Sequence, residues 1–353
     1  MSKVRLGDVA IEVRETSKCP EGLPVVGLEH LLPSEITLTQ WSDASDNTFN
    51  KLFHKGQILF GRRRAYLKKA AVAPFDGVCS GDITVIAAKP ERLLTELLPF
   101  IISNDAFFDY AMEKSAGSLS PRVKWAQLAE YEFDLPELEE QQKLANLLWA
   151  MERTRKAYQD LLIQADELVK SQFVEMFGDP ETNSLDLPLK RLPDIGENLD
   201  SRRIPITSGD RKEGKYPYYG ASGIVDYVDD YIFDEDILLI SEDGANLLAR
   251  VTPIAFPATG KVWVNNHAHV MRFPNKALQV YIEKLLNMID ISHYVTGTAQ
   301  PKLNQAKLNA IPIPIPERSV LQRYMVFVQE IDKSKYDSRV GYENFGIGGD
   351  MCA

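Results

Sequence analysis

Apolar residues recur every seven positions through the middle of the chain, in a stretch from 137 to 177 that contains neither glycine nor proline. This heptad pattern with charged flanks predicts one long helix of roughly 40 residues, and so about 60 Å in length. Gly178 followed by Pro180 predicts its end. The alternative is a helix buried in a larger core, although such helices rarely run this far without a break. We expect the packing positions to be Leu144, Leu148, Met151, Tyr158, Leu162, Ala165 and Val169.

A shorter copy of this stripe follows the run Ile311-Pro-Ile-Pro-Ile-Pro316, whose prolines predict a stiff, extended segment. Tyr324, Val328 and Ile331 take the places that Leu144, Leu148 and Met151 have in the longer helix, and we expect them to pack. The apolar pattern fades near residue 340. The glycine-rich stretch over residues 341–353 then predicts a flexible tail.

The segment before each helix mixes strand and helix signals. Short apolar runs at 57–60 and 83–88 alternate with a helical pattern around 93–112, and glycine, proline and aspartate separate them. We therefore expect an α+β chain. Its predicted parts are a first module at 1–136, a central helix at 137–180, a second module at 181–316, a short helix at 317–340 and the tail at 341–353.

The two modules share a repeated frame. The segment Gly117–Leu128 is matched by Gly297–Leu308 at an offset of 180 residues, and the match continues into the helices, whereas the interiors of the modules diverge. Two modules that share their flanking segments but differ in their interior sequences are expected to be related and to recognise different targets. Because each helix follows an equivalent module, a pseudo-twofold arrangement is expected, with the two helices packed as an antiparallel coiled coil.

Charge is segregated along the chain. The net charge of −10 alone argues against a nucleic-acid partner, but the segment from Lys51 to Ala70 carries seven basic residues and no acidic one. Apolar residues make up 44% of the sequence, which supports folded cores, and no apolar run is long enough to span a membrane. Three scattered cysteines and the lack of a signal-peptide pattern fit a reducing cytoplasm.

Catalytic motifs are missing from the sequence. Neither of the glycine-rich nucleotide loops is present. Pro193 and Asp194, followed by Glu213 and Lys215, loosely resemble a nuclease pattern, but their flanks are polar rather than strand-like. His267 and His269 would share one face of a strand and could bind a metal, but no cluster with ligand spacing accompanies them. We therefore expect no catalytic residue and no metal site.

Several segments carry the side chains that bind nucleic acids. The run from Gly61 to Lys69 supplies arginines for phosphate or guanine, with a solvated basic loop as the alternative. The Gly/Ser/Thr loops that begin at Gly117 and Gly297 are each followed by basic residues. They are suited to bind the phosphate backbone of a nucleic acid, with a structural turn as the alternative. Asn265 and Asn266 offer amides that read adenine. The candidate DNA contacts are Arg62, Arg63, Arg64, Tyr66, Lys68, Lys69, Ser118, Arg122 and Lys124 in the first module, and Tyr219, Ser222, Asn246, Lys261, Asn265, Asn266, His267, His269 and Lys302 in the second.

Taken in order, these features resemble the specificity (S) subunit of type I restriction-modification systems. The resemblance covers nearly the whole chain. It rests on the duplicated frame, on the Leu-Pro and Ile-Pro exits into the helices, and on the end of the first helix at Phe177-Gly178-Asp179-Pro180. The ordered set Tyr219–Val225, Leu239–Gly244 and Val262–His269 is typical of target recognition domains.

The resemblance implies two target recognition domains, each reading one half of a bipartite site in double-stranded DNA, and helices that set the spacing and dock two methyltransferase (M) subunits. Restriction (R) subunits join them. The resemblance also implies a prokaryotic cytoplasmic protein without a cofactor of its own. In such systems the M subunits bind S-adenosylmethionine, and the R subunits bind ATP and Mg²⁺. The second helix is shorter than is usual in the family, so the isolated chain is expected to self-associate. The alternative is a truncated or silent recognition subunit that acts mainly as a protein-interaction scaffold.

Overall fold

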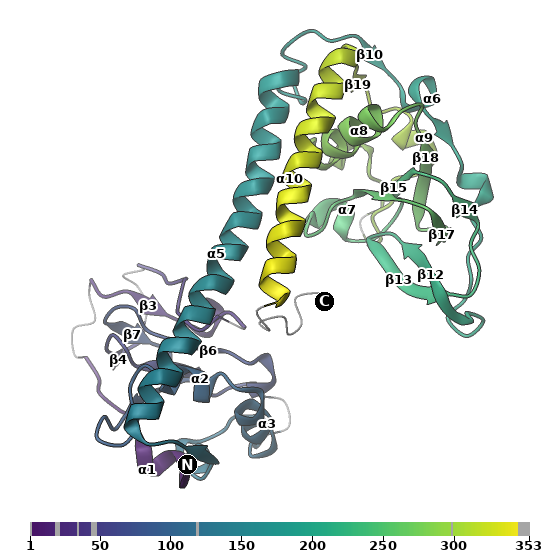
Figure 1. The fold of residues 1–353 in the computed structure, drawn as a ribbon. Helices are drawn as coiled ribbons and strands as arrows, with labels where there is room; N and C mark the ends of the chain where they lie inside the picture. The colour runs from purple at the N-terminus through teal and green to yellow at the C-terminus, as the bar shows by residue number, and fades with distance from the viewer. Residues whose placement is uncertain are drawn as a thin grey trace. The chain divides into compact units, whose positions relative to one another are not determined.

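The computed structural model describes residues 2–17, 22–33, 35–43, 48–117, 120–297 and 299–344, with side chains up to residue 338. The chain divides into two compact units, Met1–Ala157 and Tyr158–Ala353. Both units contain mixed helices and sheets, as expected, and the long helix α5 (Leu138–Phe177) contributes to each (Figure 1). No helix among the described residues is long and apolar enough to cross a membrane.

The first unit is built on two sheets. A four-stranded antiparallel sheet has the order β2-β8-β5-β6, a three-stranded sheet has the order β3-β7-β4, and β1 pairs with β9 where the chain enters and leaves the unit. Its elements are β1 (Ser2–Arg5), α1 (Leu6–Val9), β2 (Ala10–Val13), β3 (Val25–Val26), η1 (Leu28–His30), β4 (Lys51–Phe53), β5 (Ile58–Gly61), η2 (Ala65–Leu67), β6 (Ala70–Val72), β7 (Gly77–Cys79), β8 (Ile83–Ala88), α2 (Leu98–Ile102), α3 (Asp105–Glu113), α4 (Trp125–Leu128) and β9 (Glu132–Leu135).

The second unit repeats this plan. Its four-stranded sheets have the orders β11-β18-β15-β16 and β13-β12-β17-β14, and β10 pairs with β19 as β1 does with β9. Its elements are β10 (Leu189–Lys190), α6 (Leu192–Ile195), β11 (Glu197–Asn198), η3 (Asp200–Arg202), β12 (Glu213–Gly220), β13 (Gly223–Val228), β14 (Phe233–Asp234), β15 (Ile237–Ser241), α7 (Asn246–Ala249), β16 (Ala255–Ala258), β17 (Lys261–Val264), β18 (Ala268–Arg272), α8 (Lys276–Met288), η4 (Ser292–Tyr294), α9 (Gln305–Leu308), β19 (Ile313–Pro314) and α10 (Arg318–Asn344).

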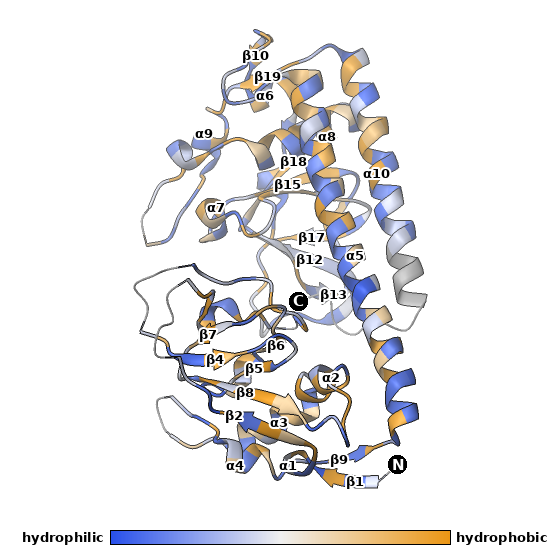
Figure 2. Cartoon of the chain, turned by 90° about the vertical axis from the view of Figure 1, so that its left-hand side faces the viewer, coloured by the Kyte–Doolittle hydropathy of each residue, from blue (hydrophilic) through white to orange (hydrophobic). Residues whose placement is uncertain are grey.

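The central strand of each unit is buried on both faces, which explains its continuous apolar sequence. In β5, Ile58 and Phe60 join the core that the helices cover, and Leu59 joins the core under the second sheet. In β15, Leu238 and Ile240 face the helical core, while Ile237 and Leu239 face the other core. Because side chains alternate along a strand, one short strand links two apolar cores in each unit. Figure 2, coloured by hydropathy, shows β8, the neighbour of β5 in the sheet, mainly in the orange of hydrophobic residues.

Two expected helices differ in extent from the prediction. The helical pattern around 93–112 is broken at Asn104, whose side chain accepts a hydrogen bond from Ala106 and caps a separate helix, α3. The second long helix does not end near residue 340 but continues through Gly341 to Asn344. A single glycine weakens a helix by about 1 kcal/mol and does not by itself end it. The rest of the expected tail, from residue 345 on, lies outside the described residues.

The second half of α5 packs antiparallel against α10 inside the second unit (Figure 1). The Tyr324 hydroxyl donates to the Val169 carbonyl at 3.2 Å, whereas Lys335, later in α10, pairs with Asp166, earlier in α5. The expected packing positions Val169, Tyr324 and Val328 are buried, and Ile331 packs against the same core. Leu162 and Ala165 are half-buried.

The predicted packing positions do not include two buried aromatic side chains at the end of α5 that pack against α10. Phe173 and Phe177 are buried among the rings of Tyr281 and Tyr324, and neither belongs to the predicted set. After Phe177 the chain turns at Gly178, whose φ of +77° suits glycine and ends the helix where the sequence predicted.

The first half of α5 packs on the first unit itself. Its Gln141 side chain hydrogen-bonds Leu94, Arg92 and Pro136. Ala145 is buried, and the predicted packing positions Leu148 and Met151 are half-buried, as is Tyr158 at the start of the second unit. Leu144, another predicted packing position, is 39% exposed.

Candidate nucleic-acid interface

In the first unit, three backbone hydrogen bonds hold the arginine loop that follows β5. The Arg62 N–H donates to the Asp82 carbonyl at 3.0 Å, and the Arg64 N–H donates to the Pro121 carbonyl at 2.9 Å. The Arg62 carbonyl accepts from Val123 at 3.0 Å. The loop is therefore fixed between the turn before β8 and the segment 121–123.

In the second unit, the same three bonds hold the loop that follows β15. The Glu242 N–H donates to the His267 carbonyl at 2.9 Å, and the Gly244 N–H donates to the Pro301 carbonyl at 3.0 Å. The Glu242 carbonyl accepts from Leu303 at 2.8 Å. Every loop and return position matches its counterpart at the 180-residue offset found in the sequence, so the repeat is also a repeat of backbone geometry.

The two copies of this frame carry opposite charges at their centre. In the first unit Arg63 Nη1 lies 3.4 Å from Asp82 Oδ2, so the loop is basic and the neighbouring turn is acidic. In the second unit Asp243 Oδ2 lies 2.8 Å from His267 Nδ1, so the loop is acidic and the turn supplies an imidazole. The frame thus places one pair of side chains in each unit, and the sequence decides whether the loop contributes a cation or an anion.

Asp82 organises the basic loop. Its carboxylate accepts from Arg122 Nε at 2.9 Å as well as from Arg63. Burial alone would raise the pKa of Asp82, but the hydrogen bonds and charges of Arg122 and Arg63 lower it below the usual range. Two of the candidate DNA-binding arginines are therefore already partnered, and they present their remaining N–H groups in fixed directions.

Arg64 is the most available cation of the loop. It is exposed, and its backbone takes a φ of +55°, in the left-handed region that costs a non-glycine residue about 1–2 kcal/mol. Its counterpart Gly244 also has a positive φ, of +107°. Since glycine meets this requirement without strain, an arginine held here at a cost points to a role for its side chain.

The other candidates of the first unit fall into two groups. Tyr66 and Lys124 are exposed beside Arg64. The remaining basic side chains turn to the protein: Lys68 pairs with Asp105, and Lys69 Nζ donates to the Leu28 carbonyl at 2.7 Å. Arg62 Nε is buried without a hydrogen-bond partner. Ser118 lies outside the described residues.

In the second unit, exposed polar groups surround the acidic loop. Asn266 and His267 lie in the turn between β17 and β18, and Lys302 pairs with Glu242 at 3.2 Å. Ser241 donates its hydroxyl to the Ala221 carbonyl, which brings the turn with the exposed Ser222 to the same place. Tyr219 is half-buried there, stacked on Phe256. Lys261 lies at the other end of β17, over the ring of Tyr231.

Three candidate residues of the second unit are structural instead. His269 is 1% exposed, with Nδ1 2.6 Å from Asp200 and Nε2 2.8 Å from the Leu303 carbonyl. Asn265 is buried, and its side-chain oxygen accepts from the His267 N–H. The amide of Asn246 is used twice, at 2.9 and 3.0 Å, by the backbone of Thr252. Their polar atoms are engaged by other groups of the same unit, which argues against the predicted DNA contacts.

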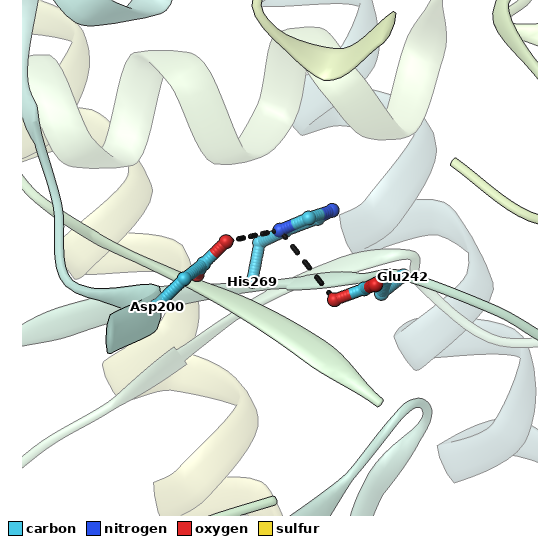
Figure 3. Close-up of side chains that lie close together, drawn as sticks. All are labelled: Asp200, Glu242 and His269. Carbon is cyan, nitrogen blue, oxygen red and sulfur yellow. Dashed lines mark hydrogen bonds and ion pairs between the residues drawn. The ribbon is translucent and has the colours of Figure 1, made fainter. Parts of the chain in front are cut away.

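Asp200, Glu242 and His269 come close enough together to suggest a metal site (Figure 3). Their surroundings argue against one. Both ring nitrogens of His269 already face oxygen acceptors, and Arg203 reaches Glu242 at 2.6 Å and Asp200 at 3.5 Å. A guanidinium takes the place that a cation would need, and both ring nitrogens of His269 are already engaged by protein atoms. The cluster is a network of ion pairs.

This network sits directly beneath the acidic loop. Burial alone would raise the pKa values of Asp200 and Glu242, but hydrogen bonds from His269 to Asp200 and from Arg203 to Glu242 lower both. Arg203 also donates to the Ala268 carbonyl at 2.8 Å. The sequence analysis missed Asp82, Asp200, Arg203 and Asp243. In the sequence each of them is a single charged residue just before a strand or after a short turn, which is the only signal that could have pointed to it. Their partners are distant along the chain, so no local pattern shows the pairing.

Comparison with known proteins places this chain in a family. The family model of the type I restriction modification DNA specificity domain matches residues 3–164 and again residues 186–335. A Haemophilus influenzae protein assigned as a type I restriction enzyme specificity subunit is 37% identical over 131 residues, which make up 37% of this chain and 34% of that protein. The match thus spans about a third of this relative's length.

Two further relatives extend over most of the chain. The MjaIX specificity subunit of the type I restriction enzyme of Methanocaldococcus jannaschii is 27% identical and covers 80% of this chain and 72% of its own. The crystal structure of a type I restriction-modification S subunit from M. genitalium shares the fold, with a TM-score of 0.66, 14% identity and coverage of 99% of this chain and 96% of that one. The chain therefore belongs to the family of type I restriction-modification DNA specificity domains, and it carries two of them in succession.

Proposed function

We propose that each unit binds one half of a bipartite sequence in double-stranded DNA, and that α5 sets the spacing between the halves. The chain then acts as the recognition subunit of a type I restriction-modification complex. The loop after β5 and the loop after β15 are the reading surfaces, each with the turn and return segment that hold it.

The observation that carries this proposal is the reversal of charge on one repeated frame. Two half-sites with different bases need two surfaces of the same shape and different chemistry. Arginine suits phosphate and the O6 and N7 atoms of guanine, which favours a role for Arg64 in the first unit. A carboxylate accepts from the N4 group of cytosine and an amide pairs with adenine, which favours Asp243 and Asn266 in the second.

Partner subunits would supply the chemistry. We propose that methyltransferase subunits with S-adenosylmethionine dock on the helices, and that restriction subunits with ATP and Mg²⁺ join them. A solved relative whose structure describes complex assembly of the type I restriction-modification system has this fold with a TM-score of 0.50. The long helices also leave apolar side chains exposed for a partner, among them Leu147 at 58% and Ile163 at 62%.

The test is to map methylated adenine across the genome of cells that carry this chain with its candidate methyltransferase subunit. A bipartite motif that disappears without the chain is expected. Arg64→Ala should relax one half of the motif, and Asp243→Asn with Asn266→Ala should relax only the other. Methylation that ignores the chain, or single-unit substitutions that alter both halves together, would contradict the proposal.

A further inference from the structure

The second unit carries a hairpin that has no counterpart among the described residues of the first unit. Its strands β12 and β13 lie side by side, with Gly220 opposite Gly223 at the turn (Figure 1). β12 also runs parallel to β17, as β3 runs parallel to β7 in the first unit. On its other side β3 has a single bridge, between Val25 and Ser42, where β12 has the whole of β13. The hairpin therefore belongs to the part of the repeat that differs between the units.

The turn of this hairpin lies beside the acidic loop. The buried Ser241, at the end of β15 and directly before the loop, donates its hydroxyl to the Ala221 carbonyl. The Asn265 N–H donates to the Tyr219 carbonyl at 3.1 Å, and Asn266 follows in the turn after β17. Hydrogen bonds thus join the hairpin turn, the loop after β15 and the turn after β17 at one edge of the unit.

Exposed apolar side chains follow directly after the hairpin turn. Ile224 is 47% exposed, Val225 is 55% exposed and Tyr227 is 51% exposed. Val225 lies over Gly220, where an added Cβ atom would come within 2.9 Å of the Val225 Cγ1 atom. Glycine at position 220 therefore leaves room for Val225. Neighbouring apolar side chains left open beside a polar loop are typical of a surface that binds another molecule.

The chemistry of the hairpin suits base edges rather than phosphates. Residues 216–228 contain no lysine or arginine, and their one acidic residue, Asp226, pairs with Arg211 at 3.1 Å. A two-stranded β-ribbon fits the major groove of B-DNA, where thymine presents its C5 methyl group. Apolar side chains contact this methyl group, which cytosine, adenine and guanine do not have. Two exposed aliphatic side chains beside base-reading polar groups match that contact.

We propose that the β12–β13 hairpin enters the major groove of the half-site read by the second unit and selects a thymine there. Ile224 and Val225 contact the C5 methyl group of this thymine, while Asp243 and Asn266 beside them read neighbouring bases. The inference rests on the proposed function, since it needs the loop after β15 to face DNA. It adds a base-specific contact that the polar residues of the loop do not make.

The test removes the methyl group from the DNA. The probe is a labelled duplex with the bipartite motif from the methylation map, in which each thymine of one half is replaced in turn by deoxyuridine, which lacks only the methyl group. The half is the one that Asp243→Asn with Asn266→Ala relaxes. Fluorescence anisotropy measures binding by the full chain together with the methyltransferase subunit used for the map. We expect about fourfold weaker binding at one position, the effect of leaving one methyl group uncontacted.

A double variant assigns this loss to the hairpin. With Ile224→Ala and Val225→Ala together, deoxyuridine at the same position should no longer weaken binding. Leu189→Ala is the matched control, because Leu189 is an aliphatic residue, 57% exposed, in a separate sheet of the same unit. It should keep the fourfold loss. All three positions are exposed, so the fold is expected to survive, which circular dichroism verifies.

The outcomes separate this inference from the proposed function. Binding that no deoxyuridine in this half weakens would overturn the inference and leave the proposed function standing, because the duplex is still bound. A loss that persists in the double variant would also overturn it, since other residues would then contact the methyl group. An unaltered duplex that does not bind would overturn the proposed function, and the inference with it.

Discussion

Arg63 and Asp243 occupy the same position in the two copies of the frame and carry opposite charges. Each lies next to a polar side chain at the equivalent turn, Asp82 in one unit and His267 in the other. The backbone bonds around them are the same in both units. The backbone frame is therefore the same in both units although the charge at its centre reverses, which allows the reading surface to change while the fold is kept.

Reversing the charge of Arg64 should weaken DNA binding. Arg64→Glu removes an exposed cation that makes no ion pair among the described residues, so the frame around Asp82 stays intact. A phosphate contact of this kind contributes close to one unit to the slope of log affinity against log salt concentration. We expect weaker binding at low salt and a slope reduced by about one, measured by anisotropy with labelled duplex DNA.

The matched control for this experiment is Lys55→Glu. Lys55 is also exposed but lies in the turn at the other end of β5, away from the loop. It changes the net charge equally, so a uniform effect of charge would appear in both variants. Equal losses in the two would remove Arg64 from the interface.

Asp82→Asn should destabilise the first unit in a manner that depends on pH. The pKa of Asp82 is lowered in the folded state, so its charged form stabilises the fold above the ordinary aspartate range near pH 4. That contribution is lost as pH falls through the folded-state pKa. Urea unfolding should therefore show a difference between the original chain and Asp82→Asn at pH 7 that shrinks toward pH 3. A difference that stays constant with pH would contradict the assigned role.

His269→Ala should be strongly destabilising, whereas His267→Ala should change stability little. Removing His269 leaves the Asp200 carboxylate, 10% exposed, without its closest donor. Breaking a buried ion pair costs about 3–5 kcal/mol. His267 is 49% exposed, and its pair with Asp243 is expected to contribute about 1 kcal/mol or less. Equilibrium unfolding of the two variants compares them, and equal stabilities would contradict the network.

A chelator should leave the melting temperature of the chain unchanged. Asp200, Glu242 and His269 lie together, but Arg203 and the Leu303 carbonyl use the atoms that a metal would need. Differential scanning fluorimetry with EDTA, and separately with added Zn²⁺, checks this. A rise in melting temperature with Zn²⁺ that His269→Ala removes would show a metal site in place of the ion pairs.

The sequence was a good guide wherever information is local or repeated. The heptad stripe placed α5, the strand at 83–88 was correct at both ends, and the 180-residue offset held for the backbone bonds of the loops. The family assignment confirms the expected relationship to the DNA specificity domains of type I restriction-modification systems. These features depend on periodicity and on order along the chain, both of which a single sequence records.

The sequence was a poor guide to what each polar side chain contacts. Asn265, Asn246 and His269 looked like base-reading groups, but their polar atoms bond the backbone of their own unit or the Asp200 carboxylate. Asp82 lies 40 positions before Arg122 and was overlooked. Burial and pairing are tertiary properties, so residue type alone could not separate a reading side chain from one that holds the frame.

The pairing of α5 with α10 leads to a prediction about Tyr324. Its ring lies against Phe173 and Phe177, and its hydroxyl donates to the Val169 carbonyl. Tyr324→Phe removes only the hydrogen bond and should cost about 1 kcal/mol, whereas Tyr324→Ala also leaves a cavity and should cost about 3–5 kcal/mol. Urea unfolding measures both, with Tyr336→Ala as the control because Tyr336 in the same helix is 66% exposed.

Similar losses for Tyr324→Ala and Tyr336→Ala would mean that the aromatic cluster does not hold the helices together. A Tyr324→Phe loss as large as that of Tyr324→Ala would assign the stability to the hydroxyl rather than to the ring.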